Sequence, residues 1–143
     1  MARMIFVNLP VTDLARSVAF YKAIGAEQNL QFSDETAAMM RFSDTINVML
    51  LTHDKFRQFT KLPIADPKEW AQVLLALSCD SREGVDEITH SALTAGGSEV
   101  HDKEDHGFMY SRAFADPDGH GWGPIWMDVA AATQAMAQVP AAA

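Results

Sequence analysis

The sequence is poor in cysteine and in basic residues. Its single cysteine, Cys79, excludes an internal disulfide and a cysteine-cluster metal site. One thiol is typical of a reducing compartment, so we expect a cytoplasmic protein. Eleven Lys and Arg residues stand against 19 Asp and Glu residues, which gives a net charge of −8. The basic residues form no run that could follow a phosphate backbone or bind an anionic membrane, so we expect neither nucleic acid nor membrane as a partner.

Long hydrophobic runs are also absent. The apolar run 4–9 is too short for the core of a signal peptide, and no stretch approaches the roughly 20 apolar residues of a membrane-spanning helix. Even so, 48% of the 143 residues are hydrophobic and only 21% are charged. That composition is sufficient for one buried core, so we expect a single soluble domain.

The hydrophobic pattern predicts two copies of one unit, in the order β-α-β-β-β. The first copy is predicted to contain strands 4–9, 28–33, 36–42 and 46–52, and a helix that Asp13 caps and Gly25 ends. The second copy is predicted to contain strands 71–79, 98–101, 108–115 and 121–127, and a helix that begins with a capping box at Asp80 and ends at Gly96.

The fold class is therefore predicted to be α+β. One domain, 1–128, would consist of module one (3–61), a connector rich in proline (62–70) and module two (71–128), and an alanine-rich tail (129–143) would follow. A small sheet with one helix on its outer face cannot bury both of its sides alone. We therefore expect the two modules to close against each other and bury their inner faces, as a curved, cupped mixed sheet with a concave inner surface and with the helices on the outer face.

Two segments make the chain recognisable. Residues 6–21 read FVNLPVTDLARSVAFY, a strand followed by a DL-x-x-S-x-x-FY helix, and residues 116–120 read DPDGH, a turn before the last strand. With the repeated unit, these motifs resemble the vicinal oxygen chelate superfamily of glyoxalase I, bleomycin-resistance proteins, fosfomycin-resistance enzymes and extradiol dioxygenases. The resemblance covers about residues 3–128 and is similar to a branch known as "predicted lactoylglutathione lyase". It implies a homodimer.

The resemblance also implies where metal-dependent members would hold a divalent ion with four ligands. On this sequence the four positions fall on Phe6, Leu50, Leu74 and Gly123, whose side chains carry no metal donor. We therefore predict no cofactor and a small-molecule-binding protein of the bleomycin-resistance kind. The alternative is a metal-dependent lyase or dioxygenase that recruits a divalent ion elsewhere, for example with His101 and His106.

Strand alternation extends the set of residues predicted to line the cavity. Asn8 shares a strand face with Phe6, and Ala76 and Ser78 share one with Leu74. The Asn8 amide would serve either a ligand or a hydrogen bond to a neighbouring strand. The cavity candidates are Phe6, Asn8, Leu50, Leu74, Ala76, Ser78, His106, Tyr110, Arg112 and Gly123.

Two of these candidates carry alternatives. Arg112 shares a strand face with Tyr110, and its guanidinium would either clamp an anionic group of the ligand or form a surface salt bridge. His106 ends a polar loop, 102–107, that would either lie over the mouth of the cavity or be solvated. No catalytic residue is assigned, because the sequence contains no recognisable nucleophile triad, phosphate-binding loop or carboxylate pair.

Overall fold

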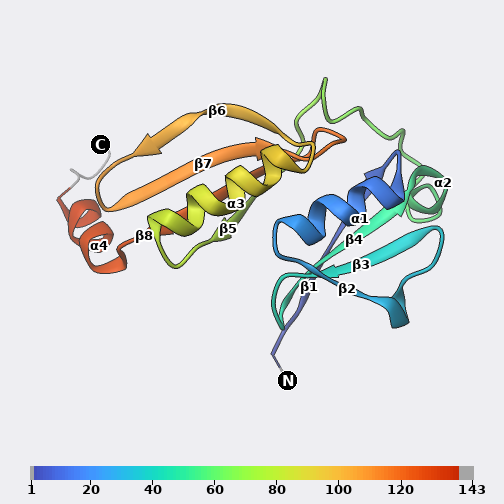
Figure 1. The fold of residues 1–143 in the computed structure, drawn as a ribbon, viewed down its shortest axis with the longest axis horizontal. Helices are drawn as coiled ribbons and strands as arrows, with labels where there is room; N and C mark the ends of the chain where they lie inside the picture. Colours follow the sequence, from blue (N-terminus) through green and yellow to red (C-terminus); the bar gives the residue numbers. More distant parts are fainter. Residues whose placement is uncertain (1, 139–143) are drawn as a thin grey trace.

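The computed structural model describes residues 2–138 as two four-stranded sheets side by side, each with a helix against it (Figure 1). The strands of the first sheet lie in the order β1-β4-β3-β2 and those of the second in the order β5-β8-β7-β6. In both sheets the first and last strands of the unit pair in parallel, and the other neighbours are antiparallel. The predicted α+β class and the repeated unit are confirmed.

The elements alternate along the chain as the hydrophobic pattern indicates. The strands are β1 (Ile5–Val11), β2 (Glu27–Asn29), β3 (Ala37–Arg41), β4 (Ile46–Thr52), β5 (Leu74–Ser78), β6 (Ser98–Asp105), β7 (Met109–Ala115) and β8 (Gly121–Met127). The helices are α1 (Leu14–Ala23), the 3-10 turn η1 (Leu30–Phe32), α2 (His53–Phe56), α3 (Arg82–Thr94) and α4 (Val129–Ala137). Within residues 2–138, none of these helices is long and apolar enough to cross a membrane.

The helix ends follow local side-chain chemistry. The Asp13 carboxylate accepts a hydrogen bond from the backbone N–H of Arg16 and begins α1, as predicted. For α3 the cap is Ser81, whose hydroxyl accepts from Gly84 N–H, so the prediction of Asp80 was wrong by one residue. Gly25 ends α1 with a φ of 106°, a conformation that glycine adopts without strain.

Three predicted strands differ from the structure by three residues or more at one end, and the others differ by at most two. The strand predicted at 28–33 stops at Asn29, because the Asn29 side chain accepts from Gln31 N–H and starts η1. The strand predicted at 71–79 begins only at Leu74. The strand predicted at 98–101 continues to Asp105, because it pairs with β7 through two register shifts, and its charged residues had indicated a loop.

The hydrophobic core lies on the helix-covered faces of both sheets. Phe20 and Tyr21 of α1 are fully buried, and they pack against β1, β3 and β4 of the first sheet and against Phe114 and Trp122 of the second. The two modules thus meet through their outer faces. The expectation that they bury their inner faces against each other was wrong for this chain, and Leu74 on the inner face of β5 is 82% exposed.

The β7–β8 turn joins the modules through a buried carboxylate. Asp116 Oδ1 accepts from the backbone N–H groups of Asp118, Gly119 and His120, at 2.9–3.0 Å. Its Oδ2 accepts from the Tyr21 hydroxyl at 2.6 Å, and Trp122 Nε1–H donates to the same hydroxyl at 3.0 Å. Burial, and then the Asp116 charge, raise the pKa of Tyr21 well above its ordinary value, so the hydroxyl keeps its proton and donates it.

A second carboxylate of the turn reaches the start of α1. Asp118 Oδ1 accepts from the Thr12 N–H at 2.9 Å and from its hydroxyl at 2.7 Å, and Asp118 Oδ2 accepts from the Ser17 hydroxyl. A negative charge is favoured there, because the first N–H groups of a helix are unpaired and carry its positive dipole end. The DPDGH motif is therefore the joint between the two modules.

We expect Tyr21→Phe to destabilise the fold by about 1–3 kcal/mol, because Asp116 Oδ2 and the Trp122 N–H each lose their hydrogen bond to the Tyr21 hydroxyl. Urea unfolding at neutral pH measures the change. Tyr110→Phe is the matched control, since that hydroxyl donates to Asp86, whose side chain is about half exposed. The assignment is contradicted if both variants lose the same stability.

Candidate ligand-binding hollow

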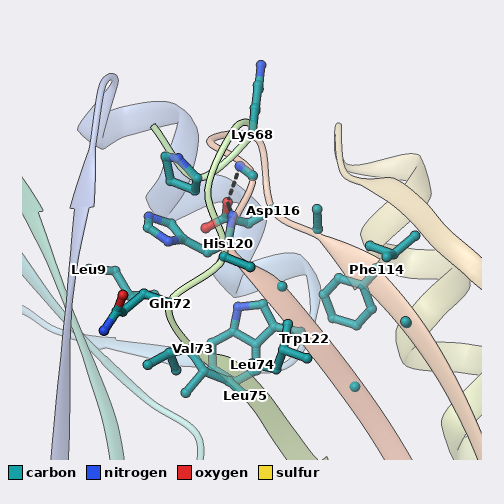
Figure 2. Close-up of a pocket in the computed structure, with 18 of the residues that line it drawn as sticks. Leu9, Lys68, Gln72, Val73, Leu74, Leu75, Phe114, Asp116, His120 and Trp122 are labelled. Carbon is teal, nitrogen blue, oxygen red and sulfur yellow. Dashed lines mark hydrogen bonds between the residues drawn. The ribbon is translucent and has the colours of Figure 1, made fainter. Parts of the chain in front are cut away.

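A hollow of about 1260 Å³ lies on the open, concave side of the second sheet. Its walls include residues 8–10 of β1, residues 62–65 and 70–76 of the connecting segment and β5, residues 111–115 of β7, and residues 119–123 of the β7–β8 turn and β8. Figure 2 shows this region from within, with Leu9 on the side of β1 and Phe114 on the other side. Because both modules contribute, the hollow depends on the joint at Asp116.

The concave face of the second sheet is built mainly from small residues. Strand pairing sets Leu74, Gly121, Ala115 and Ser98 side by side in one row. The neighbouring row is Ala76, Gly123, Ala113 and His101. We call Gly121, Gly123, Ala113 and Ala115 the Gly/Ala floor. A Cβ placed on Gly123 would meet only the Arg112 carbonyl oxygen, at 3.6 Å, so nothing fills the space above this residue.

Polar groups gather at the end of the hollow near β1. His120 Nε2 lies 2.8 Å from the Pro10 carbonyl oxygen, so this nitrogen carries a proton and donates it. Figure 2 places His120 and Gln72 between β1 and the Asp116 turn. Asn8 is exposed here, and its side chain forms no hydrogen bond within residues 2–138.

Several residues singled out from the sequence lie in this hollow. Asn8, Leu74, Ala76 and Gly123 line it. Phe6 has the same parity as Asn8 on β1, but it is 46% exposed and lies outside the lining residues. Ser78 is on the same face as Leu74 and Ala76, further along β5, and also lies outside the lining.

Leu50 was assigned to the wrong face of its strand. The parallel pairing of β1 with β4 sets Leu50 beside Leu9, whose side chain packs under α1, and Leu50 is completely buried in the core. The alternation of side chains along β1 was predicted correctly. Which face of β4 carries Leu50 depends on how β4 pairs with β1, and this is a contact between residues far apart in sequence. The residues of β4 that face the other way from Leu50 are Asn47, Met49 and Leu51.

Tyr110 and Arg112 face the outer side of the sheet. The Tyr110 hydroxyl donates to Asp86 of α3 at 2.7 Å, and Arg112 lies 3.2 Å from Asp86 and 3.5 Å from Glu99. The Tyr110 hydrogen bond, followed by that of Arg112, lowers the pKa of the Asp86 carboxyl. Of the two alternatives for Arg112, the structure therefore shows the salt bridge, and only part of Arg112 borders the hollow.

The chain is similar to known proteins in sequence and in fold. Residues 3–43 match the family model described as "Bleomycin resistance protein-like N-terminal". A solved structure of a hypothetical protein from S. aureus is 25% identical, covers 88% of this chain and 94% of its own, and has a TM-score of 0.74. No curated protein matches the chain.

Two further similar structures are of proteins described as resistance proteins. A bleomycin resistance determinant encoded on the transposon Tn5 is 20% identical over 89% of this chain and 99% of its own, with a TM-score of 0.58. A fosfomycin resistance protein from Listeria monocytogenes is 20% identical over 91% and 97%, with a TM-score of 0.67. The chain has the fold of the vicinal oxygen chelate superfamily. The resemblance seen in the sequence is thereby confirmed.

The residues at the superfamily's metal positions do not fit a divalent ion. Phe6, Leu74 and Gly123 offer no side-chain donor, and Met49 and Leu51 offer no hard oxygen or nitrogen ligand. Asn47, on the same face of β4, is completely buried, and its amide nitrogen donates to the Ile5 carbonyl oxygen. Within residues 2–138, no three His, Cys, Asp or Glu side chains lie close enough to hold a metal. No step of a reaction is therefore derived through a metal.

The histidines proposed as replacement ligands lie on different parts of the hairpin between β6 and β7. His101 is in β6, in the same row as Gly123 on the concave face, and its Nδ1 lies 2.7 Å from the Asp102 carbonyl oxygen. His106 follows the strand, 3.8 Å from the Glu104 carboxylate, and lies outside the lining of the hollow. The predicted loop over the cavity is mostly the edge strand β6.

Sequence reasoning missed the connecting segment and His120 as parts of the site. Leu62, Ile64, Trp70 and Val73 line the hollow, although the sequence analysis treated this region as a connector and a strand end. The apolar residues in this proline-containing segment were a sequence signal that it covers an apolar surface. His120 had been interpreted only as a turn residue. Its approach to Pro10 follows from the docking of the two modules.

An ion pair holds the hairpin of β6 and β7, whose residues form one wall of the hollow. Arg82 at the start of α3 donates to both Asp105 oxygens, at 2.8 and 2.9 Å, and to the Gly107 carbonyl at 2.7 Å. Its guanidinium lies about 5 Å from the rings of Tyr110 and Trp126. Hydrogen bonds from Arg82, and then from Gly107 N–H, lower the pKa of Asp105 to about 2.

Because this folded-state pKa lies below the ordinary value of 3.8, the ion pair stabilises the hairpin fully above pH 4. We expect that contribution to be lost as the pH falls from about 4 through about 2. Amide hydrogen exchange of residues 103–108 across this range measures it. In Asp105→Asn the same amides should exchange faster at neutral pH and lose this pH dependence. An unchanged profile in that variant would contradict the assignment.

Proposed function

We propose that this protein binds a small organic molecule in the hollow without the aid of a metal ion. The observation that carries the proposal is the hollow itself, an open space of about 1260 Å³ whose surface is mostly apolar side chains and small residues with a few polar groups. This composition is typical of small-molecule sites. The positions where related enzymes would chelate a metal are apolar here, which favours binding over metal-assisted catalysis.

The comparisons support the same reading at the level of family. One structural neighbour is described as a bleomycin resistance determinant and another as a fosfomycin resistance protein. Both descriptions concern the handling of a small molecule, and this chain shares their fold. No observation supports the alternative of a metal-dependent lyase or dioxygenase, since neither His101 nor His106 belongs to a cluster of metal donors within residues 2–138. A cytoplasmic location remains a prediction from the composition.

We also propose a homodimer. Large apolar side chains are exposed at the start of β1, where Ile5 is 55% and Phe6 46% exposed, and at the start of β5, where Leu74 is 82% exposed. Both strands are sheet edges, so a second copy would cover apolar surface together with unpaired strand edges. Sedimentation should show a dimer at micromolar concentration. Phe6→Glu should weaken it at least tenfold, and a wild-type monomer would contradict the proposal.

Binding is tested by a thermal-shift screen of diverse small molecules in the presence of EDTA. A ligand at 100 times its Kd stabilises the folded state by about 2.7 kcal/mol, which raises the Tm by several degrees. We expect hits whose effect is lost in Ala76→Leu, since that side chain projects into the hollow.

Ala15→Leu, on the exposed side of α1, is the matched control and should keep every hit. Hits that require an added divalent cation would support the metal-dependent alternative instead. Hits that Ala76→Leu leaves unchanged would place binding outside the hollow and overturn the proposed site.

A further inference from the structure

The floor of the hollow has a shape that selects among ligands. Resting on the proposed function, we infer that its ligand carries a flat aromatic ring system, which lies on the Gly/Ala floor of β7 and β8 against the indole of Trp70. The inference names a ligand class by shape, and it depends on three features of the same cavity.

The first feature is a flat depression at the centre of the sheet. Each of the two central strands presents only Gly or Ala here, at positions 121 and 123 of β8 and 113 and 115 of β7. The Leu74 side chain on β5 reaches over Gly121, where an added Cβ would meet its Cδ2 at 3.0 Å, so the open space lies over Gly123. Ile125 on β8 and His101 on β6 stand beside that space. A ring can lie flat on such a floor, whereas a globular group of equal mass would be held off by the surrounding side chains.

The second feature is that the protein itself has no need for glycine at position 123. The residue lies inside β8 with ordinary strand geometry, since the positive-φ glycines among residues 2–138 are Gly25, Gly96, Gly107 and Gly119. A side chain there would find open space. Glycine inside a strand costs stability, and it often marks a place where another group approaches the backbone closely. Here the open side is the hollow.

The third feature is an exposed aromatic side chain on another wall. Trp70 lines the hollow from the connecting segment and is nevertheless 72% exposed. Its backbone is fixed by a turn in which Trp70 N–H donates to the Asp66 carbonyl at 3.0 Å. An indole gains most from a flat partner, through offset stacking or edge-to-face contact in addition to the buried area. Floor and indole together therefore favour a planar ring.

Two amines with equal numbers of carbon and nitrogen atoms test whether the ligand must be flat. 1-Naphthylmethylamine and 1-adamantylmethylamine have the same number of carbon atoms and one primary amine, but only the first is flat. We expect calorimetric titration of the full chain to show binding of the naphthyl compound at least tenfold tighter than that of the adamantyl compound. Gly123→Leu should remove this preference and weaken the naphthyl compound at least tenfold. Trp70→Ala should weaken it severalfold, and Trp70→Phe should restore most of the affinity.

Ala15→Leu serves again as the control, and circular dichroism with thermal unfolding shows whether Gly123→Leu is folded. If that variant does not fold, the Trp70 pair decides, because its side chain is exposed. Equal binding of the two amines overturns the inference of a flat ligand, and so does failure of the naphthyl compound to bind at millimolar concentration. The thermal-shift screen tests the proposed function separately, because its hits can have any shape.

Discussion

The buried carboxylate of Asp116 is the group on which the rest of the molecule depends. It orders its own turn through three backbone N–H groups and accepts a hydrogen bond from the Tyr21 hydroxyl of the other module. A buried charge is stable only when such partners satisfy it. The turn is therefore held in one conformation, and α1 is held against both sheets. With the outer faces joined in this way, the concave face of the second sheet stays open.

In this arrangement the joint between the modules is separate from most of the residues that line the hollow. The joint is made by the DPDGH turn and α1, and Phe6, Leu74 and Gly123 have no part in it. The hollow has a largely apolar surface, with polar groups such as Asn8, Gln72 and His120 near β1. The chemistry of such a surface is recognition by shape and burial.

Much of the fold was predictable from local patterns. Asp13 and Gly25 bound α1 as their cap chemistry indicates, and the alternation of β1 separates Leu9 in the core from Asn8 in the hollow. Two of the errors share one cause. Leu50 was assigned to the wrong face and β6 was predicted too short because both depend on which residues of a neighbouring strand lie alongside. Register of that kind is set by contacts far apart in sequence.

The sequence by itself determined the repeated unit, the two motifs, the absence of donors at the superfamily's metal positions and the small residues of β7 and β8, because these follow from residue identity and short-range periodicity. Only the tertiary structure decided that the modules join through their outer faces, that His120 reaches Pro10 and that the connecting segment forms a wall of the hollow. Those features arise from the docking of two separately folded sheets. Their docking is governed by buried hydrogen bonds between residues about 100 positions apart.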